Sequence, residues 1–255
     1  MGTDKDWERW GATDPYFGVL SSDRYHKDRL NDVIKKEFFA TGNTHIKRVF
    51  RLINENFNQT FQPNRALDFG CGVGRITLPL AKRTAYALGV DISPSMIAEA
   101  ADNAKSLGIT NVGFVLSDDL LTNVVGKFSL IHSYIVLQHI PWERGRLILQ
   151  ELSLKVEPGG YLAVHLFISC NASNLVRAAV RFRYALPPPL HWLRNLIKHR
   201  PLFEPAMQLH TYDINTVIED LKERNFDTPI CCNEPDIDGF KSVFLLARRI
   251  SNDTK

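Results

Sequence analysis

The chain has 255 residues, 44% of them hydrophobic and 23% charged, with a formal net charge of +3. This length allows one large domain with additions or two small ones, and the composition is ordinary for a globular protein. The polar, acidic start is not a signal peptide pattern, the longest apolar run is too short to span a bilayer, and the four cysteines show neither metal-ligand spacing nor a disulfide framework. We therefore expect a reduced, cytoplasmic protein without a metal site.

The first 62 residues are predicted to form an arm and two helices. Residues 1–20 are rich in aromatic and turn-forming residues and have no clear period. Apolar residues three and four apart then predict helices over residues 28–39 and 44–57, separated by the breaker "ATGN", with Asn43 or Thr44 capping the second helix. We expect residues 1–62 to cover the active site of a domain formed by residues 63–255.

Short apolar runs alternate with helical stretches from Ala66 onward. A helix is expected to begin near Gly74, another is capped by Ser93 and ended by Gly108, and a third is stopped by Pro158. The predicted strands cover residues 65–69, 86–92, 112–118, 128–136 and 160–167. This alternation predicts an α/β fold with a doubly wound, mostly parallel sheet and helices on both faces.

The end of the chain departs from this pattern. Residues 169–210 are too long for an ordinary connection and are predicted to be an insertion. A helix over residues 212–226 follows, and strands over 228–234 and 241–249 are expected to form an antiparallel terminal hairpin. The sheet would then have seven strands.

The stretch "LDFGCGVGR" places glycines where the first strand hands over to a helix, which lets a ligand approach the backbone closely. The dinucleotide pattern G-x-G-x-x-G fails here, because Arg75 or Thr77 stands where its third glycine should be, and no P-loop Gly-Lys follows. Asp68 precedes the glycines, and its carboxylate would repel a pyrophosphate but suits a ligand with positive charge. The loop therefore favours a cationic nucleotide ligand over NAD.

These motifs resemble those of class I S-adenosylmethionine (SAM)-dependent methyltransferases with a Rossmann-like fold. "ALDFGCGVGR", "GVDISPSMI", "FVLSDDL", "FSLIHSYIVLQHIP" and "LKVEPGGYLAV" follow in the order of that family's motifs over about residues 64–168. The resemblance implies that Asp91 takes the ribose hydroxyls and that Asp118 approaches the adenine amino group. It implies SAM as cofactor, S-adenosylhomocysteine as product, and the following cofactor-binding residues: Asp68, Gly70, Cys71, Gly72, Gly74, Arg75, Asp91, Ile92, Met96, Asp118, Asp119, Leu120 and Ser133.

Three residues are candidates for acid–base catalysis, namely His139, His210 and Tyr212. A base is needed only if the acceptor arrives protonated, because the sulfonium is already an activated electrophile. His139, after the fourth strand, is the preferred base. The alternative interpretations are that His139 caps the next helix, that Tyr212 supports a helix entry, and that His165 is simply buried within its strand.

Two additions to the core are predicted to determine the acceptor. The arm "WERWGATDPYFGVL" contributes Tyr16 and Phe17, and the core contributes Tyr134 and His165; alternatively, the arm's aromatics only anchor it. No Asp or Glu lies between Glu157 and Glu204, whereas Arg181, Arg183 and other cations do. This charge pattern favours an anionic small molecule such as a nucleotide sugar, with a solvated face or peripheral contact with anionic lipid as alternatives.

The sequence lacks the N/D-P-P-Y/F/W segment of nucleic-acid amino methyltransferases and the Pro-Cys pair of cytosine C5 enzymes, so nucleic acid is disfavoured as substrate. The predicted function is methyl transfer from SAM to a small-molecule acceptor by direct in-line displacement. The alternatives are a non-catalytic SAM-binding regulatory or partner protein, and an RNA or protein methyltransferase.

Overall fold

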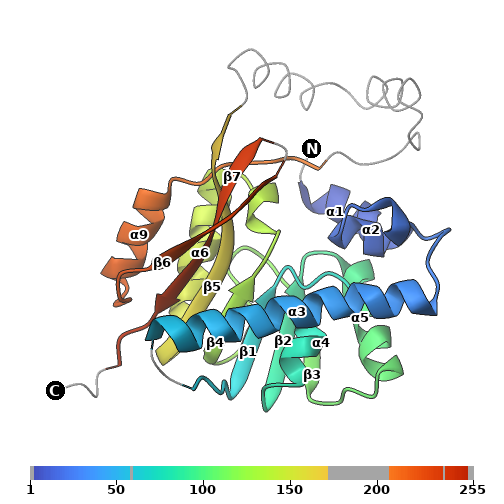
Figure 1. The fold of residues 1–255 in the computed structure, drawn as a ribbon, viewed down its shortest axis with the longest axis horizontal. Helices are drawn as coiled ribbons and strands as arrows, with labels where there is room; N and C mark the ends of the chain where they lie inside the picture. The colour runs from blue at the N-terminus through green and yellow to red at the C-terminus, as the bar shows by residue number, and fades with distance from the viewer. Residues whose placement is uncertain (1–2, 58–59, 172–206, 238, 252–255) are drawn as a thin grey trace.

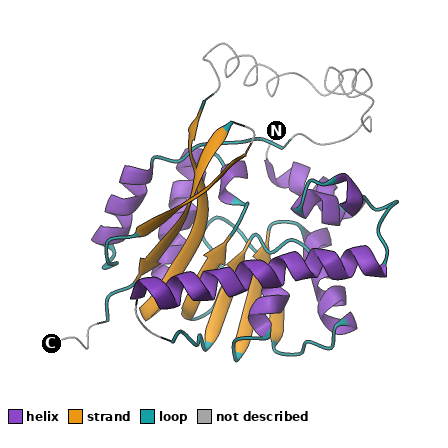
Figure 2. Ribbon diagram, in the orientation of Figure 1, coloured by secondary structure: helices purple, strands orange, loops and turns teal. Residues whose placement is uncertain are grey.

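A computed structural model of the chain describes residues 3–57, 60–171, 207–237 and 239–251. In this part of the chain, one sheet has seven strands in the order β3-β2-β1-β4-β5-β7-β6 (Figure 1, Figure 2). The strands are β1 (Arg65–Phe69), β2 (Tyr86–Asp91), β3 (Val112–Leu116), β4 (Phe128–Ser133), β5 (Val156–Cys170), β6 (Ile230–Ile237) and β7 (Phe240–Arg248). β1 to β5 pair in parallel, and β7 pairs antiparallel to both β5 and β6. The predicted fold class, with its antiparallel terminal pair, is confirmed.

Helices cover both faces of this sheet (Figure 1). α3 (Asp32–Phe57) and α4 (Thr77–Ala81) pack on one face, and α6 (Trp142–Lys155) and α9 (Ile214–Glu223) pack on the other. α5 (Pro94–Ser106) connects β2 to β3. Since β1 and β4 are neighbours while β2 lies on the other side of β1, the strand order reverses at β1. Ligands of open α/β sheets bind at the carboxyl edge beside such a reversal.

Several local predictions are confirmed. β1 has the predicted bounds, and the Ser93 hydroxyl caps α5 by accepting a hydrogen bond from the Met96 N–H at 3.1 Å. Gly108 follows α5 with a positive φ of 64°. Pro158, however, does not stop α6, because the helix ends at Lys155 and β5 already begins at Val156.

The two helices predicted before the sheet form one helix, α3, so the prediction of a break at "ATGN" and of a cap at Asn43 or Thr44 was wrong. The break was predicted because Gly42 weakens a helix by about 1 kcal/mol relative to Ala. Burial explains why the helix continues. Gly42 is buried, and Ile46, Val49 and Ile53 pack into the core against strand residues.

The arm without a clear period is also helical. α1 (Thr3–Thr13) and α2 (Pro15–Val19) are followed by the short 3-10 helix η1 (Asp23–Tyr25). Their apolar side chains form a cluster of their own that includes Trp10, Tyr16 and Met96 of α5. The arm is therefore packed against α5.

Most of the predicted insertion at 169–210 lies outside the described residues, and so do Arg181 and Arg183. β5 extends to Cys170, and the chain is described again from Met207. None of the helices that the structure describes is long and apolar enough to cross a membrane.

Candidate functional site

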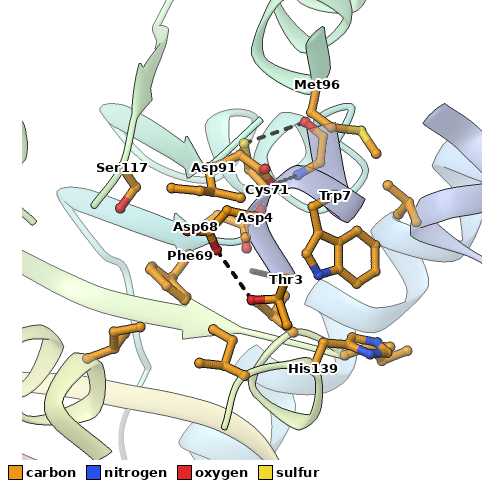
Figure 3. A pocket seen from close by; sticks show the side chains of 18 of the residues that line it. Thr3, Asp4, Trp7, Asp68, Phe69, Cys71, Asp91, Met96, Ser117 and His139 are labelled. Carbon is orange, nitrogen blue, oxygen red and sulfur yellow. Dashed lines mark hydrogen bonds between the residues drawn. The ribbon is translucent and has the colours of Figure 1, made fainter. Parts of the chain in front are cut away.

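A cavity lies at the carboxyl edge of β1, β2 and β4 (Figure 3). The loop after β1 forms its floor, and the segment after β4, including the 3-10 helix η2 (Leu137–His139), forms one side. α1 and α2 contribute Thr3, Asp4, Trp7, Gly18 and Val19 to the opposite wall. The residues that the motifs predict and that line this cavity are Asp68, Gly70, Cys71, Gly72, Arg75, Asp91, Ile92, Met96, Asp118, Asp119, Tyr134 and His139.

The glycine loop after β1 requires residues without a side chain. Gly70 and Gly72 have positive φ values of 72° and 52°, which glycine adopts most readily. A Cβ atom at Gly70 would lie 2.4 Å from Val136, and one at Gly72 would lie 2.4 Å from Val19. The loop therefore approaches both walls of the cavity closely, and its backbone is open to a ligand.

Asp68 stands at the start of a buried chain of hydrogen bonds. Its Oδ2 accepts a hydrogen bond from Thr77 at 2.7 Å, and its Oδ1 lies 3.0 Å from Nδ1 of His132. Nε2 of His132 lies 2.9 Å from Nε2 of His45 in α3. With the His132 Nδ1–H donating to Asp68, His45 must donate its Nε2–H to His132. Asp68 is thus tied to α4 and, through His132, to α3, a connection that the sequence pattern did not indicate.

Asp91 ends β2 and is held in place by backbone donors. Its carboxylate accepts hydrogen bonds from the N–H of Gly72 at 2.9 Å and of Ser93 at 3.0 Å. Burial raises its pKa, while these backbone hydrogen bonds oppose the rise. Asp118 is exposed, and hydrogen bonds from the side chain and backbone of Thr122 hold its pKa below the usual value. Both carboxylates border the cavity where a ribose and an adenine of SAM are expected.

α1 is fastened over the cavity by polar contacts. Arg144 of α6 bonds Asp119 at 2.7 Å and Asp4 of α1 at 2.6 Å, and the hydrogen bond to Asp119 is the main cause of its raised pKa. Glu8 accepts hydrogen bonds from the hydroxyls of Ser93 and Ser95 at the start of α5. These contacts hold α1 at the site through Asp4 and Glu8, which the sequence pattern did not single out.

His139 faces the cavity beside Trp7, with ring centroids 4.9 Å apart (Figure 3). Its Nδ1 lies 2.8 Å from the backbone oxygen of Gln208, so Nδ1 carries the proton and Nε2 has the free lone pair. Burial is the main cause that lowers the pKa of His139 to about 4. The imidazole is therefore neutral at physiological pH.

Other predicted site residues lie away from the cavity. Tyr212 is buried, its hydroxyl donates to the backbone oxygens of Leu137 and Ile140, and it does not line the cavity. The His210 N–H donates to the Gln138 oxygen, and His210 does not line the cavity. Both residues support the segment that carries His139.

Three residues predicted to contact the substrate, Tyr16, Phe17 and His165, also lie outside the cavity lining. Tyr16 is buried and donates from its hydroxyl to Glu99 and Asn103 of α5, and Phe17 stacks on His26 at 3.9 Å. His165 is buried in β5, with ring centroids 5.0 Å from Tyr134. None of the three lines the cavity, because each is used in packing.

Three predicted cofactor residues also lie outside the cavity lining, namely Gly74, Leu120 and Ser133. Ser133 donates its hydroxyl to the Phe69 oxygen, and Leu120 is exposed. Ser133 thus joins β4 to the end of β1, next to the glycine loop.

The geometry fits SAM. The loop leaves room for a ligand at its backbone, and the carboxylates of Asp68, Asp91 and Asp118 line the cavity and suit a cationic ligand. A sheet of this order with this loop at the strand reversal defines the class I, Rossmann-like methyltransferase fold. Residues 66–160 match the family described as "Methyltransferase domain". This part of the chain is a methyltransferase domain, as the motifs predicted.

Solved structures of the same fold contain the cofactor or its product. Magnesium protoporphyrin IX methyltransferase of Synechocystis PCC 6803 with S-adenosylhomocysteine is 20% identical, with a TM-score of 0.58 over 93% of this chain and 98% of that chain. The N-methyltransferase NodS of Bradyrhizobium japonicum WM9 with S-adenosylhomocysteine is 17% identical, with a TM-score of 0.60 over 98% and 99%. At these identities the likeness establishes the fold alone.

Curated relatives match only part of the chain. The 23S rRNA (uracil(1939)-C(5))-methyltransferase of Marinomonas posidonica is 32% identical over 51% of this chain and 31% of its own length. The enzyme of the same name from Shewanella amazonensis is 36% identical over 46% and 25%. The chain therefore spans less than a third of these relatives.

Proposed function

We propose that this protein transfers the methyl group of SAM to a small, anionic acceptor molecule by direct in-line displacement. The observation that carries this proposal is that the cofactor motifs and α1 line the same cavity. Since Arg144 and Glu8 fasten α1 across it, the acceptor must enter between the arm and the segment after β4. Such a space favours a small molecule over a polymer.

In this mechanism SAM supplies a methyl group on a positively charged sulfur, which any well-aligned nucleophile can accept. The protein binds the nucleoside through Asp91 and Asp118 and places the acceptor on the His139 side of the cavity. Trp7 packs against His139 and excludes water from that side. Catalysis then comes mainly from alignment of the two reactants.

His139 is the candidate base for an acceptor that carries a proton on oxygen or nitrogen. Its Nε2 lone pair is fixed by the Nδ1 hydrogen bond to Gln208, and its low pKa keeps it neutral. His139→Gln keeps the size of the side chain but cannot take up the proton, so kcat should fall while the affinity for SAM stays the same. An unchanged kcat would assign His139 to packing.

RNA methylation is the second candidate, because the curated relatives are named as rRNA uracil C5 methyltransferases. Carbon 5 of uracil becomes nucleophilic only after a protein nucleophile adds to the ring, a role suited to a cysteine thiolate. Of the four cysteines, Cys71 lines the cavity, and burial raises its pKa well above the usual value, so it stays protonated. This chemistry disfavours uracil C5 as the acceptor atom.

Incubating the protein with methyl-labelled SAM and a SAM-depleted cell extract distinguishes these functions. Acid precipitation separates RNA and protein from small metabolites, and an anion exchanger then retains the anionic ones. We expect the label in the acid-soluble, retained fraction, and Asp91→Ala as the matched control should abolish it. Label in the RNA precipitate would support the second candidate, and SAM binding without transfer to any fraction would indicate a non-catalytic protein.

A further inference from the structure

A second hollow lies beside the cofactor cavity. Arg75, Tyr134 and Ile135 line both spaces, so the two are adjacent. One face of α3 forms much of the remaining wall. The lining residues lie on one face because residues three and four apart on a helix are neighbours on its surface. The α3 side chains that line the hollow are Thr41, Thr44, His45, Lys47, Arg48 and Arg51.

The hollow is strongly positive. Lys47, Arg48, Arg51 and Arg75 line it, whereas the residues that line it include no carboxylate. Glu234 of β6 forms an ion pair with Arg48, which neutralises that cation. Arg51 lies 3.9 Å from the exposed Glu55, a separation at which an exposed ion pair is weak. Lys47 and Arg75 have no ion pair among the described residues.

Arg75 is the strongest sign that a ligand belongs here. Its side chain is 5% exposed, and its Nε has no hydrogen-bond partner in the described part of the chain. Its Nη1 reaches the Thr41 hydroxyl at 3.3 Å. Asp68 acts on Arg75 electrostatically, but His132 and Thr77 already bond both oxygens of Asp68. A buried guanidinium donor without an acceptor is costly, and a bound anion would remove that cost.

We propose that this hollow is an oxyanion subsite that holds the carboxylate or phosphate group of the methyl acceptor. Arg75 offers its unpartnered Nε donor at the buried end of the hollow, and the exposed Lys47 and Arg51 supply charge at its rim. Tyr134 borders both spaces, so an acceptor anchored here extends past its ring into the cofactor cavity. The identity of the anion as an acceptor group rests on the proposed function, whereas anion binding itself does not.

The inner wall of the hollow also suits a small organic anion. The rings of His45 and Tyr134 lie 3.9 Å apart, and His45 is held by its hydrogen bond to His132. Burial is the main cause that lowers the pKa of His45, and the nearby Arg75 and Arg48 lower it further, so this ring is neutral. The hollow therefore combines a neutral aromatic side with a cationic side, which fits an acid with an apolar or aromatic body.

The test titrates the protein with inorganic phosphate and, separately, with succinate in a calorimeter at low ionic strength. The variant Lys47→Gln/Arg51→Gln removes two exposed rim cations without touching the core. Lys36→Gln/Lys222→Gln is the matched control, because both of its lysines are exposed and lie outside the hollow. We expect saturable binding of one probe, weakened roughly tenfold in the rim variant and unchanged in the control.

The tighter probe identifies the group, phosphate or carboxylate. The proposal fails if neither probe binds saturably, or if the rim variant binds as tightly as the control. A SAM titration of the same variants should show equal affinity, and a loss in the rim variant would assign the hollow to the cofactor instead. Since these titrations need no turnover, absence of methyl transfer would overturn the proposed function and leave the anion site standing.

Discussion

Replacing Gly42 by Ala should destabilise the protein, although Ala is the better helix former. Helix propensity alone predicts a gain of about 0.8–1 kcal/mol for this change in the middle of α3. The structure predicts the opposite sign, because a Cβ atom at Gly42 would lie 1.9 Å from the backbone oxygen of Arg75, where an ordinary contact begins at 3.4 Å. That oxygen belongs to the backbone of the glycine loop after β1, so it cannot relieve the clash by rotating as a side chain can.

The expected net loss is about 1–3 kcal/mol, the usual cost of overpacking a well-packed site. For a protein of this size, thermal unfolding should show a Tm lower by about 2–4 °C for each kcal/mol. SAM affinity should also fall, because α3 and the segment at Arg75 must move apart to make room for the alanine Cβ. Ala40→Gly, at an exposed position of the same helix, measures propensity alone and should cost about 1 kcal/mol. A Gly42→Ala protein as stable as the original would refute the packing of α3 on the loop.

Three further results are expected. Acid should destabilise the protein, because burial lowers the pKa of both His139 and His165 to about 4 and unfolding restores the value near 6.5. This stability is complete above pH 6.5 and is lost as pH falls toward 4, by about 2 kcal/mol per histidine at pH 5. Urea midpoints at pH 7.5 and 5.0 measure the loss, and equal midpoints would contradict it. Asp91→Asn should weaken SAM binding about tenfold or more, since an amide accepts fewer hydrogen bonds than a carboxylate; equal calorimetric affinity would remove Asp91 from the site. Arg144→Gln should release α1 and raise the KM for SAM several-fold while Tm changes little, as digestion of α1 by a protease would report independently.

The sequence predicted the sheet well because its signals are local. Apolar runs such as "RALDF" and the Ser93-Pro94 start of α5 depend on neighbours within a few residues. The acids at strand ends were also predictable, because the cofactor motifs have a fixed order along the chain. Asp91 and Asp118 therefore line the cavity as the motifs implied.

Contacts between distant segments were not predictable from local pattern. Tyr212 was an attractive candidate because it precedes α9, yet its hydroxyl donates to carbonyls of the segment after β4. Asp4 lies in a stretch without a clear period, and only the folded arm brings it to Arg144. In the sequence, His45 is one position of an amphipathic helix. Only the fold brings His132 of β4 into hydrogen-bond contact with it.

The position of α3 in the core has a consequence for cooperativity. Residues 66–160 match the family on their own, but Ile46, Val49 and Ile53 cover one face of their sheet. A chain shortened to begin at residue 63 would expose that face to water and lose the donor that His45 gives to His132. The predicted boundary near residue 62 is thus a boundary of sequence pattern, and heating should melt both sides of it in one transition.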